Sequence, residues 1–325
     1  MKTVKMVKSN SVETAGPILV TGAGGTLGYY FCSAWGNGRA TGRRVVPVIR
    51  DRTAWVNPLG QGSNLAPVEV LDLSDGALTN RMIARLKPSV VIHCAALADV
   101  DQCEEDRDIA FRDNVEATRS IVSALRRHVP DCHLVHISTD QVYCDGGGYR
   151  GDLGPVNIYG WTKLWSEDIA RQHKVTTVFR LNYVGRGVRG RSGLINWLVE
   201  SLSAEKPVTL FQDVLFNPCH GALVPQVAGQ MISTRTLGTF NLGAHGGGLS
   251  KADFLLAVAR EFCLPIQTVQ FGRLSDLSLK APRALDIRMD VSATETALGE
   301  KLPCLSKTLE ALVDEWQQKG KHDAW

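Results

Sequence analysis

Residues 17–28 read PILVTGAGGTLG, and this stretch decides the fold. Its apolar half, Pro17–Thr21, predicts a buried strand, and a helix is expected to begin at about Thr26. The glycines between them allow a sharp turn and let backbone N–H groups approach a pyrophosphate at the helix N-terminus. This strand–turn–helix context favours a dinucleotide site over an ordinary tight turn. The residues expected to line it are Gly22, Gly25, Thr26, Leu27 and Gly28.

Strands and helices alternate through the first half of the chain. Apolar, β-branched runs predict further strands at residues 44–49, 68–72, 89–95, 133–138 and 176–181. The segments between them predict helices that end near residue 87, span 106–128 and span about 159–173. This alternation specifies a parallel sheet with helices on both faces, an α/β fold of the Rossmann-type doubly wound kind.

The regular alternation of strands and helices ends after residue 181, where short strands and helices predict a smaller, mixed α/β region. We expect a flexible polar leader at residues 1–16 and a dinucleotide-binding domain at 17–182. Residues 183–325 are expected to form mainly a substrate-binding region, with 207–245 returning to the first domain.

Composition excludes several classes of protein. The formal net charge of +3 is dispersed, so no nucleic-acid partner is expected. The chain has no signal-peptide core and no run of about 18 apolar residues, which predicts no membrane partner and a cytoplasmic location. The eight cysteines stand singly and indicate a reducing compartment without structural zinc. Acidic residues at 99–106 are interpreted as a solvated helix start rather than a Mg²⁺ site, so no metal is expected.

The end of the second predicted strand bears on the choice of cofactor. Arg50 is the first residue past the apolar run, and a guanidinium matches a ribose 2′-phosphate in charge and geometry. NADP(H) is therefore the expected cofactor, although Asp51 keeps NAD(H) possible, and a solvated turn of mixed charges is the competing interpretation. Asp72 ends the third strand, where it would reach the adenine amine or cap a helix.

Tyr159 and Lys163 stand four residues apart, so a helix would bring a phenol and an ammonium to one face. A nearby ammonium favours the phenolate and lowers the pKa of a phenol from about 10, which suits it to proton transfer. Thr139 follows the fifth predicted strand, at the edge where parallel sheets open onto their ligand crevice. With the glycine turn, these residues predict a site of hydride and proton transfer.

Five motifs occur in an order typical of one family. They are VVIHCAA at 90–96, VDxxE at 100–104, NVxAT at 114–118, STDxVY at 138–143 and PxNxYGxTK at 155–163. On these motifs the chain resembles the extended short-chain dehydrogenases/reductases and, within them, the dTDP-4-dehydrorhamnose reductase-like group. The resemblance extends from about Ile18 to Trp316.

The resemblance implies that Tyr159 is the general acid for carbonyl reduction, while Lys163 holds the nicotinamide ribose and lowers the pKa of the tyrosine. It also implies that Thr139 hydrogen-bonds the substrate oxygen. Asn114 would support Lys163 through its backbone, with a helix-surface asparagine as the competing interpretation. Further cofactor contacts are expected from Leu73, Ala95, Ala96 and Leu97.

The residues expected around the substrate match the group less well. Gln141 and Tyr183 stand where rhamnose-forming enzymes usually carry Tyr and Trp, and Ala98 stands where Thr is common. Asn182 follows a strand where extended reductases often contact a diphosphate. Asn196 begins a helix whose N-terminus could contact the diphosphate in the same way. The expected substrate contacts are Val100, Gln141, Asn182, Tyr183 and Asn196, with packing or turn formation as the competing interpretation.

The leading hypothesis is NADPH-dependent reduction of a nucleotide-linked 4-keto-6-deoxy sugar, with the tyrosine as proton donor. One alternative is a non-catalytic NADP-binding regulatory subunit resembling the β subunit of methionine adenosyltransferase. Another is a sugar-nucleotide epimerase or dehydratase, although no Glu follows Asp140 as a dehydratase would require. The expected partner is a nucleotide sugar, and a homodimer is a possible assembly because the family often forms dimers.

Overall fold

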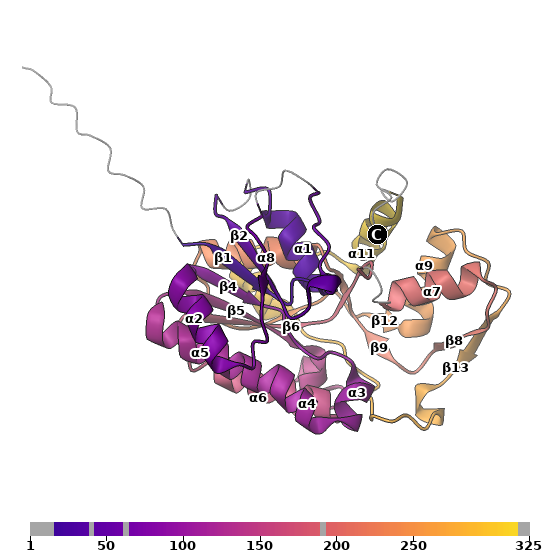
Figure 1. The fold of residues 1–325 in the computed structure, drawn as a ribbon. Coiled ribbons are helices and arrows are strands. Elements are labelled where there is room, and N and C mark those ends of the chain that lie inside the picture. The colour runs from indigo at the N-terminus through magenta and orange to yellow at the C-terminus, as the bar shows by residue number, and fades with distance from the viewer. Residues whose placement is uncertain (1–15, 39–41, 61–64, 189–192, 318–325) are drawn as a thin grey trace, which may run out of the picture.

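The computed structural model describes residues 16–38, 42–60, 65–188 and 193–317. Its largest sheet contains strands β1 (Ile18–Thr21), β2 (Val45–Ile49), β3 (Glu69–Val70), β4 (Val90–His93), β5 (His133–Thr139), β6 (Thr176–Leu181) and β11 (Gly238–Leu242). All neighbours pair in parallel, in the order β11-β6-β5-β4-β1-β2-β3 (Figure 1). The order from β3 to β6 is that of a Rossmann fold, which confirms the predicted fold class.

Helices cover both faces of this sheet (Figure 1). Helix α1 (Thr26–Trp35) packs with α8 (Leu223–Ser233), and Phe31 and Met231 join one core. On the other face α2 (Gly76–Leu86), α5 (Ala117–His128) and α6 (Ile158–Ala170) bury a second core. The strands carry continuous apolar runs because both of their faces are covered.

The long helix predicted at 106–128 is not regular. It consists of α4 (Arg107–Phe111), a π-helical turn (Arg112–Glu116) and α5, and the short α3 (Val100–Glu105) precedes it. A π turn shifts the side chains that follow it around the helix axis, and such turns are frequent at functional sites. One side chain of this turn, that of Asp113, lines the candidate site described below.

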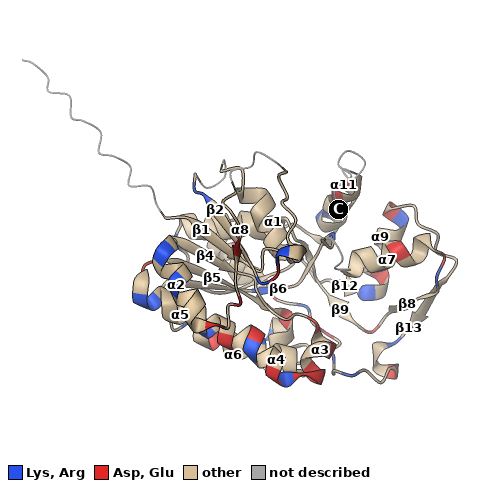
Figure 2. Cartoon of the chain, viewed as in Figure 1, with Lys and Arg blue, Asp and Glu red and all other residues tan. Residues whose placement is uncertain are grey.

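The acidic residues at 99–106 begin helices, as predicted. Asp99 accepts from the backbone N–H of Gln102 at the start of α3, and Asp106 accepts from that of Ile109 at the start of α4. Figure 2 shows acidic residues gathered at α3. Within the described ranges, no group of three or more His, Cys, Asp and Glu side chains has the arrangement of a metal site.

The smaller region has its own core around the buried Phe254. Its helices are α7 (Leu194–Ser203), α9 (Lys251–Glu261) and α11 (Leu305–Gln317), whereas α10 (Ser292–Leu298) packs on α8 and β11 of the larger region. Its strand pairs are β7 (Tyr183–Val184) with β10 (Cys219–His220), β9 (Leu215–Phe216) with β12 (Leu249–Ser250), and β8 (Val208–Phe211) with β13 (Val269–Gly272). Of the segment 207–245, therefore, α8 and β11 join the large sheet and its layers, whereas β8 does not.

Other elements also differ from the sequence-based expectation. The strand expected at 68–72 shortens to β3, and α8 was not predicted. Its Pro225 lies in the first helical turn, where a missing N–H costs no hydrogen bond. All eight cysteines are free thiols. No helix in the described part of the chain is both long and apolar enough to cross a bilayer. Nearly all of the predicted leader lies outside the described residues.

Candidate active site

The carboxyl ends of the central strands open onto a crevice of about 580 Å³. It extends from the end of β2, across the glycine turn after β1, to the end of β5 and the start of α6. The predicted residues that line it are Gly22, Gly25, Thr26, Leu27, Gly28, Arg50, Asp72, Leu73, Ala95, Ala96, Thr139, Tyr159 and Lys163. The structure thus brings most of the expected cofactor residues and all three expected catalytic residues to one cavity.

The glycine turn fits a pyrophosphate. Gly22 has a φ of +64°, and a Cβ there would lie 2.7 Å from the backbone nitrogen of Ala95. A Cβ on Gly28 would collide with the backbone of Gly22 and Ala23. Gly25 caps the ten-residue helix α1 without a side-chain hydrogen bond, so its first N–H groups face the crevice rather than a capping oxygen.

Arg50 lines the crevice and is held by an ion pair. Its Nη1 donates to Oδ2 of Asp113 at 2.6 Å, and this hydrogen bond raises the pKa of the guanidinium. Asp113 belongs to the π turn and also pairs with Arg112 at 2.9 Å. The Arg50 side chain remains 58% exposed, so the ion pair holds its guanidinium at the wall without removing it from the crevice.

The two acidic residues near Arg50 are engaged locally. Asp51 accepts from the backbone and hydroxyl of Thr53, and Asp72 accepts from the backbone and hydroxyl of Ser74. These hydrogen bonds lower the pKa of both carboxyl groups. Asp72 does not cap α2, as had been one interpretation, because Asp75 does so.

The start of α6 sets the position of Tyr159. Asn157 caps this helix by accepting from the backbone N–H of Gly160 at 2.9 Å. A Cβ on Gly160 would collide with the Gln141 carbonyl, so a glycine is needed where α6 crosses the end of β5. This close approach brings Tyr159 to Thr139, with which it forms a side-chain hydrogen bond.

Lys163 is buried and donates to a backbone carbonyl. Its side chain is 3% exposed, and its Nζ donates to the Ile137 carbonyl at 2.7 Å. Burial lowers the pKa of Lys163 to about 8. Burial also raises the pKa of Tyr159 above its ordinary value, and the Thr139 hydrogen bond offsets this only in part. Desolvation dominates the net shift of the Tyr159 pKa, so a lowering of this pKa by Lys163 stays a prediction.

Asp140 is a titratable neighbour of this site that sequence analysis did not assign. Its Oδ1 accepts from the Thr139 hydroxyl at 2.9 Å, and Gln141 donates to the same oxygen at 3.4 Å. Burial raises the pKa of Asp140 to about 6, although Lys251 and both hydrogen bonds oppose the shift. The hydroxyl of Thr139 thus lies between a carboxyl group and the phenol.

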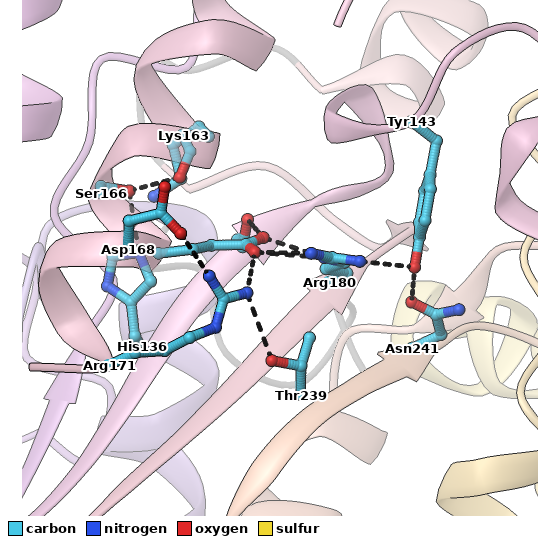
Figure 3. A network of polar contacts seen from close by, with 11 residues as sticks. His136, Tyr143, Lys163, Ser166, Asp168, Arg171, Arg180, Thr239 and Asn241 are labelled. Atoms are coloured by element: carbon cyan, nitrogen blue, oxygen red, sulfur yellow. Dashed lines mark hydrogen bonds and ion pairs between the residues drawn. The ribbon is translucent and has the colours of Figure 1, made fainter. Parts of the chain in front are cut away.

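Behind the catalytic residues lies a buried ion-pair network (Figure 3). Glu167, fully buried, accepts from Ser138 Oγ at 2.5 Å and from Arg180 through Nη2 at 2.7 Å. Arg180 also donates to the Tyr143 hydroxyl at 2.9 Å, which donates to Asn241 at 2.7 Å. This network joins α6, β5, β6 and β11, and it fixes Ser138 directly before Thr139.

Asn114 and Leu97 do not line the crevice as predicted. The Asn114 amide instead holds the Leu97 backbone, accepting from its N–H at 2.7 Å and donating to its carbonyl at 3.1 Å. It also donates to Thr162 Oγ1 at 2.9 Å, and its own carbonyl accepts from Thr118. Asn114 is buried, so it is not a helix-surface residue either. It ties the loop after β4 to α6.

A second pocket of about 320 Å³ adjoins the crevice, because Thr26 and Tyr183 line both. Asn182 also lines it, as the sequence predicted for a substrate residue, and its Nδ2 is buried with no hydrogen-bond partner among the described residues. The start of α7 forms another wall. An unpaired buried amide is costly, so a ligand that brings an acceptor to this donor would be favoured.

Three expected substrate residues lie outside both pockets. Asn196 accepts from the Gly187 backbone at 2.7 Å and so shapes a loop that lines the second pocket. Gln141 is bonded to Asp140 and accepts from Asn157 at 3.2 Å. Val100 begins α3. The polar groups of Asn196 and Gln141 serve local structure, which single-sequence motifs cannot distinguish from ligand contacts.

Sequence analysis also missed residues that the structure brings to the pockets. Asp113 belongs to a π turn, which the pattern of apolar residues does not predict. Lys251 belongs to a helix more than 100 residues after the strand that carries Thr139. Asp140 had a detectable signal, since it directly follows Thr139 at a strand end.

Fold and site together define an extended short-chain dehydrogenase/reductase, a class of NAD(P)-dependent oxidoreductases. The chain belongs to the RmlD substrate binding domain family, whose model matches residues 16–318.

Curated relatives fall into two kinds. The probable low-salt glycan biosynthesis reductase Agl14 of Haloferax volcanii is 27% identical over 256 residues, which cover 76% of this chain and 84% of the relative. A dTDP-4-dehydrorhamnose reductase of Streptomyces griseus is 36% identical, but the match covers only 46% of this chain and 43% of the length of that reductase. Methionine adenosyltransferase 2 subunit beta of Xenopus laevis is 27% identical over 98% of this chain and 95% of its own.

Solved structures agree on the fold. A dTDP-4-dehydrorhamnose reductase of Clostridium acetobutylicum superposes with a TM-score of 0.79 at 21% identity, covering 93% of this chain and 99% of that one. The Bacillus anthracis dTDP-4-dehydrorhamnose reductase in complex with NADP gives 0.75 at 20% identity, with the same coverage.

Proposed function

We propose that this protein reduces the keto group of a nucleotide-linked 4-keto-6-deoxy sugar with NADPH. The observation that carries the proposal is the convergence of Thr139, Tyr159 and Lys163 in the crevice that begins at the glycine turn. Relatives named as sugar-nucleotide or glycan reductases support the substrate class.

Cofactor binding is assigned to the glycine turn and α1, whose first N–H groups receive the pyrophosphate. Lys163 binds the nicotinamide ribose. Arg50 binds the 2′-phosphate, and Asp113 holds the Arg50 guanidinium in position. When bound, the cofactor supplies a hydride to the carbonyl carbon. These residues therefore orient the cofactor, which supplies the hydride, and the proton comes from another side chain of the protein.

Tyr159 donates its phenolic proton to the oxygen that becomes an alkoxide as the hydride arrives. Its raised pKa keeps the phenol protonated near neutral pH, which suits a proton donor. Thr139 positions the substrate oxygen beside the phenol; its hydroxyl, which donates its one proton to Asp140 in the free protein, turns to that oxygen when the substrate binds. Asn182 and the start of α7 bind the diphosphate of the substrate.

A regulatory role is the second candidate. The methionine adenosyltransferase β subunits match nearly the whole chain, whereas the Streptomyces reductase matches less than half. A regulatory subunit would bind NADP without turnover and would act through a partner enzyme. A dehydratase is less well supported, because Gln141 follows Asp140 where that activity would use Glu.

Absorbance of NADPH, followed with a panel of dTDP- and UDP-linked 4-keto-6-deoxy sugars, tests the proposal. Loss of absorbance with at least one sugar, matched by formation of the reduced sugar, is the expected result. Tight NADPH binding with no absorbance change across the panel would favour the regulatory role instead.

A further inference from the structure

Lys251 is the charged residue of the second pocket for which sequence analysis gave no role. It is the first residue of α9, and its backbone N–H donates to the Val214 carbonyl at 2.7 Å. Ser250 caps the same helix and pairs with Leu215 in the β12–β9 ladder. These contacts fix the backbone from which the Lys251 side chain enters the pocket.

The Lys251 side chain is half-buried and its ammonium has no close counter-ion. Its Nζ lies 5.9 Å from the centroid of the Phe216 ring, and burial lowers the pKa of the lysine. Within the described ranges, no carboxylate oxygen lies within 4.0 Å of it. Asp140 is the acidic neighbour that raises its pKa, and Arg283 adds a second positive charge that lowers it.

Other polar groups belong to residues that line the same pocket. Asn182 is 8% exposed, and its Nδ2 has no partner among the described residues. Leu194 begins the ten-residue helix α7, whose cap, Gly193, provides no side-chain acceptor for the first N–H groups. An ammonium, an amide and a helix N-terminus, from three separate elements, therefore converge on one cavity. Such a set matches an anion of more than one charge.

We propose that Lys251 is a specificity-determining residue that supplies the cation for the diphosphate of the nucleotide substrate. The inference rests on the proposed function, because it assigns one residue of the substrate site. A diphosphate brings a second phosphate to the ammonium, whereas a nucleoside monophosphate does not. Lys251 thus selects for nucleoside diphosphate derivatives rather than for the base or the sugar.

The test uses the full-length protein with NADPH, and dTDP, UDP, dTMP and UMP as probes, by titration calorimetry. Lys251→Met keeps a long apolar side chain against Phe216 but removes the charge. Its Kd for dTDP or UDP should rise roughly 10-fold to 100-fold, the size of one charge-assisted hydrogen bond. The Kd for the monophosphates should change less than 3-fold, and Lys251→Arg should restore most of the diphosphate affinity.

Two controls separate the possible failures. Lys307→Met removes an exposed lysine of α11, paired with Glu310, and should leave every Kd unchanged. NADPH affinity and the unfolding curve of Lys251→Met should match those of the wild type, which excludes misfolding. Equal diphosphate affinity in Lys251→Met and wild type would overturn the inference alone. Failure of the wild type to bind any of the four nucleotides would overturn the proposed substrate class, and this inference with it.

Discussion

Lys163 and Ile137 join helix α6 to strand β5, because the buried ammonium donates to the carbonyl at 2.7 Å. The bond lies two residues before Thr139, and Tyr159 stands one helical turn before the lysine. The lysine therefore has a structural role in the arrangement of the catalytic residues, besides the ribose contact assigned to it.

Tyr159→Phe should abolish reduction while leaving cofactor binding nearly unchanged. The substitution removes the proton donor but keeps the ring that lines the crevice. We expect kcat to fall at least 10²-fold to 10⁴-fold, the usual contribution of general acid catalysis, with a change in NADPH Kd below about 3-fold. Tyr149→Phe, at an exposed tyrosine, is the control. Persistent ketone reduction by Tyr159→Phe would refute the assigned proton donor.

Arg50→Asp should discriminate between the two cofactors. The new carboxylate would repel a 2′-phosphate and would also face Asp113, so the KM for NADPH should rise roughly 10-fold or more. The KM for NADH should change much less. The same measurement on Arg52→Asp, an exposed neighbour, shows the effect of charge alone. Equal effects of Arg50→Asp on both cofactors would remove the 2′-phosphate assignment.

Glu167→Gln should strongly destabilise the fold. The change leaves the Arg180 guanidinium, only 9% exposed, without its counter-charge, and breaking one partner of a buried pair costs about 3–5 kcal/mol. Urea unfolding measures this free energy. Asp168→Asn breaks an exposed pair with Arg171 on the same helix and should change stability by less than about 1 kcal/mol. A similar loss of unfolding free energy in the two variants would show that the buried network does not stabilise the fold as predicted.

Stability should fall as pH is lowered from 6.5. Burial lowers the pKa of His93 to about 3, of His133 to about 4, and of His136 well below its ordinary value. These imidazoles are neutral when folded, so below pH 6.5 the unfolded chain binds more protons and each group costs up to about 1.4 kcal/mol per pH unit. Asp140, with its pKa raised to about 6, acts oppositely below that pH, as one group against three.

Urea unfolding at pH 7.0 and pH 5.0 measures this dependence. In His93→Gln the loss between the two values should be smaller than in the wild type, because one depressed imidazole is gone. A free energy of unfolding that is constant from pH 7.0 to pH 5.0 would contradict the neutral state of these side chains.

The local motifs were sufficient to predict the sheet and most of the crevice. Strand–turn–helix spacing around Gly22–Gly28 and the YxxxK spacing are properties of neighbouring residues, so the sequence carries them directly. The pairing of Arg50 with Asp113 is not such a property, because it depends on a π turn 63 residues away. Side chains used for local bracing, such as Asn196, look the same in sequence as ligand contacts.

Electrostatics is the other part of the site that the sequence does not reveal. The spacing of Tyr159 and Lys163 correctly places them near each other, but it carries no information about burial. Desolvation acts on both groups and dominates the net shift of the phenol pKa. Only the packing of α6 on β5 reveals it.

Isotope transfer is the most direct measurement of the central claim, that this site delivers hydride and proton to a sugar carbonyl. NADPH deuterated at C4 would be incubated with the protein and a nucleotide-linked 4-keto-6-deoxy sugar, and the product examined by mass spectrometry and NMR. We expect one deuterium at the former carbonyl carbon, with oxidised cofactor formed in equal amount and no transfer by Tyr159→Phe. A sugar without deuterium, after incubation across the panel with NADPH demonstrably bound, would contradict the central claim.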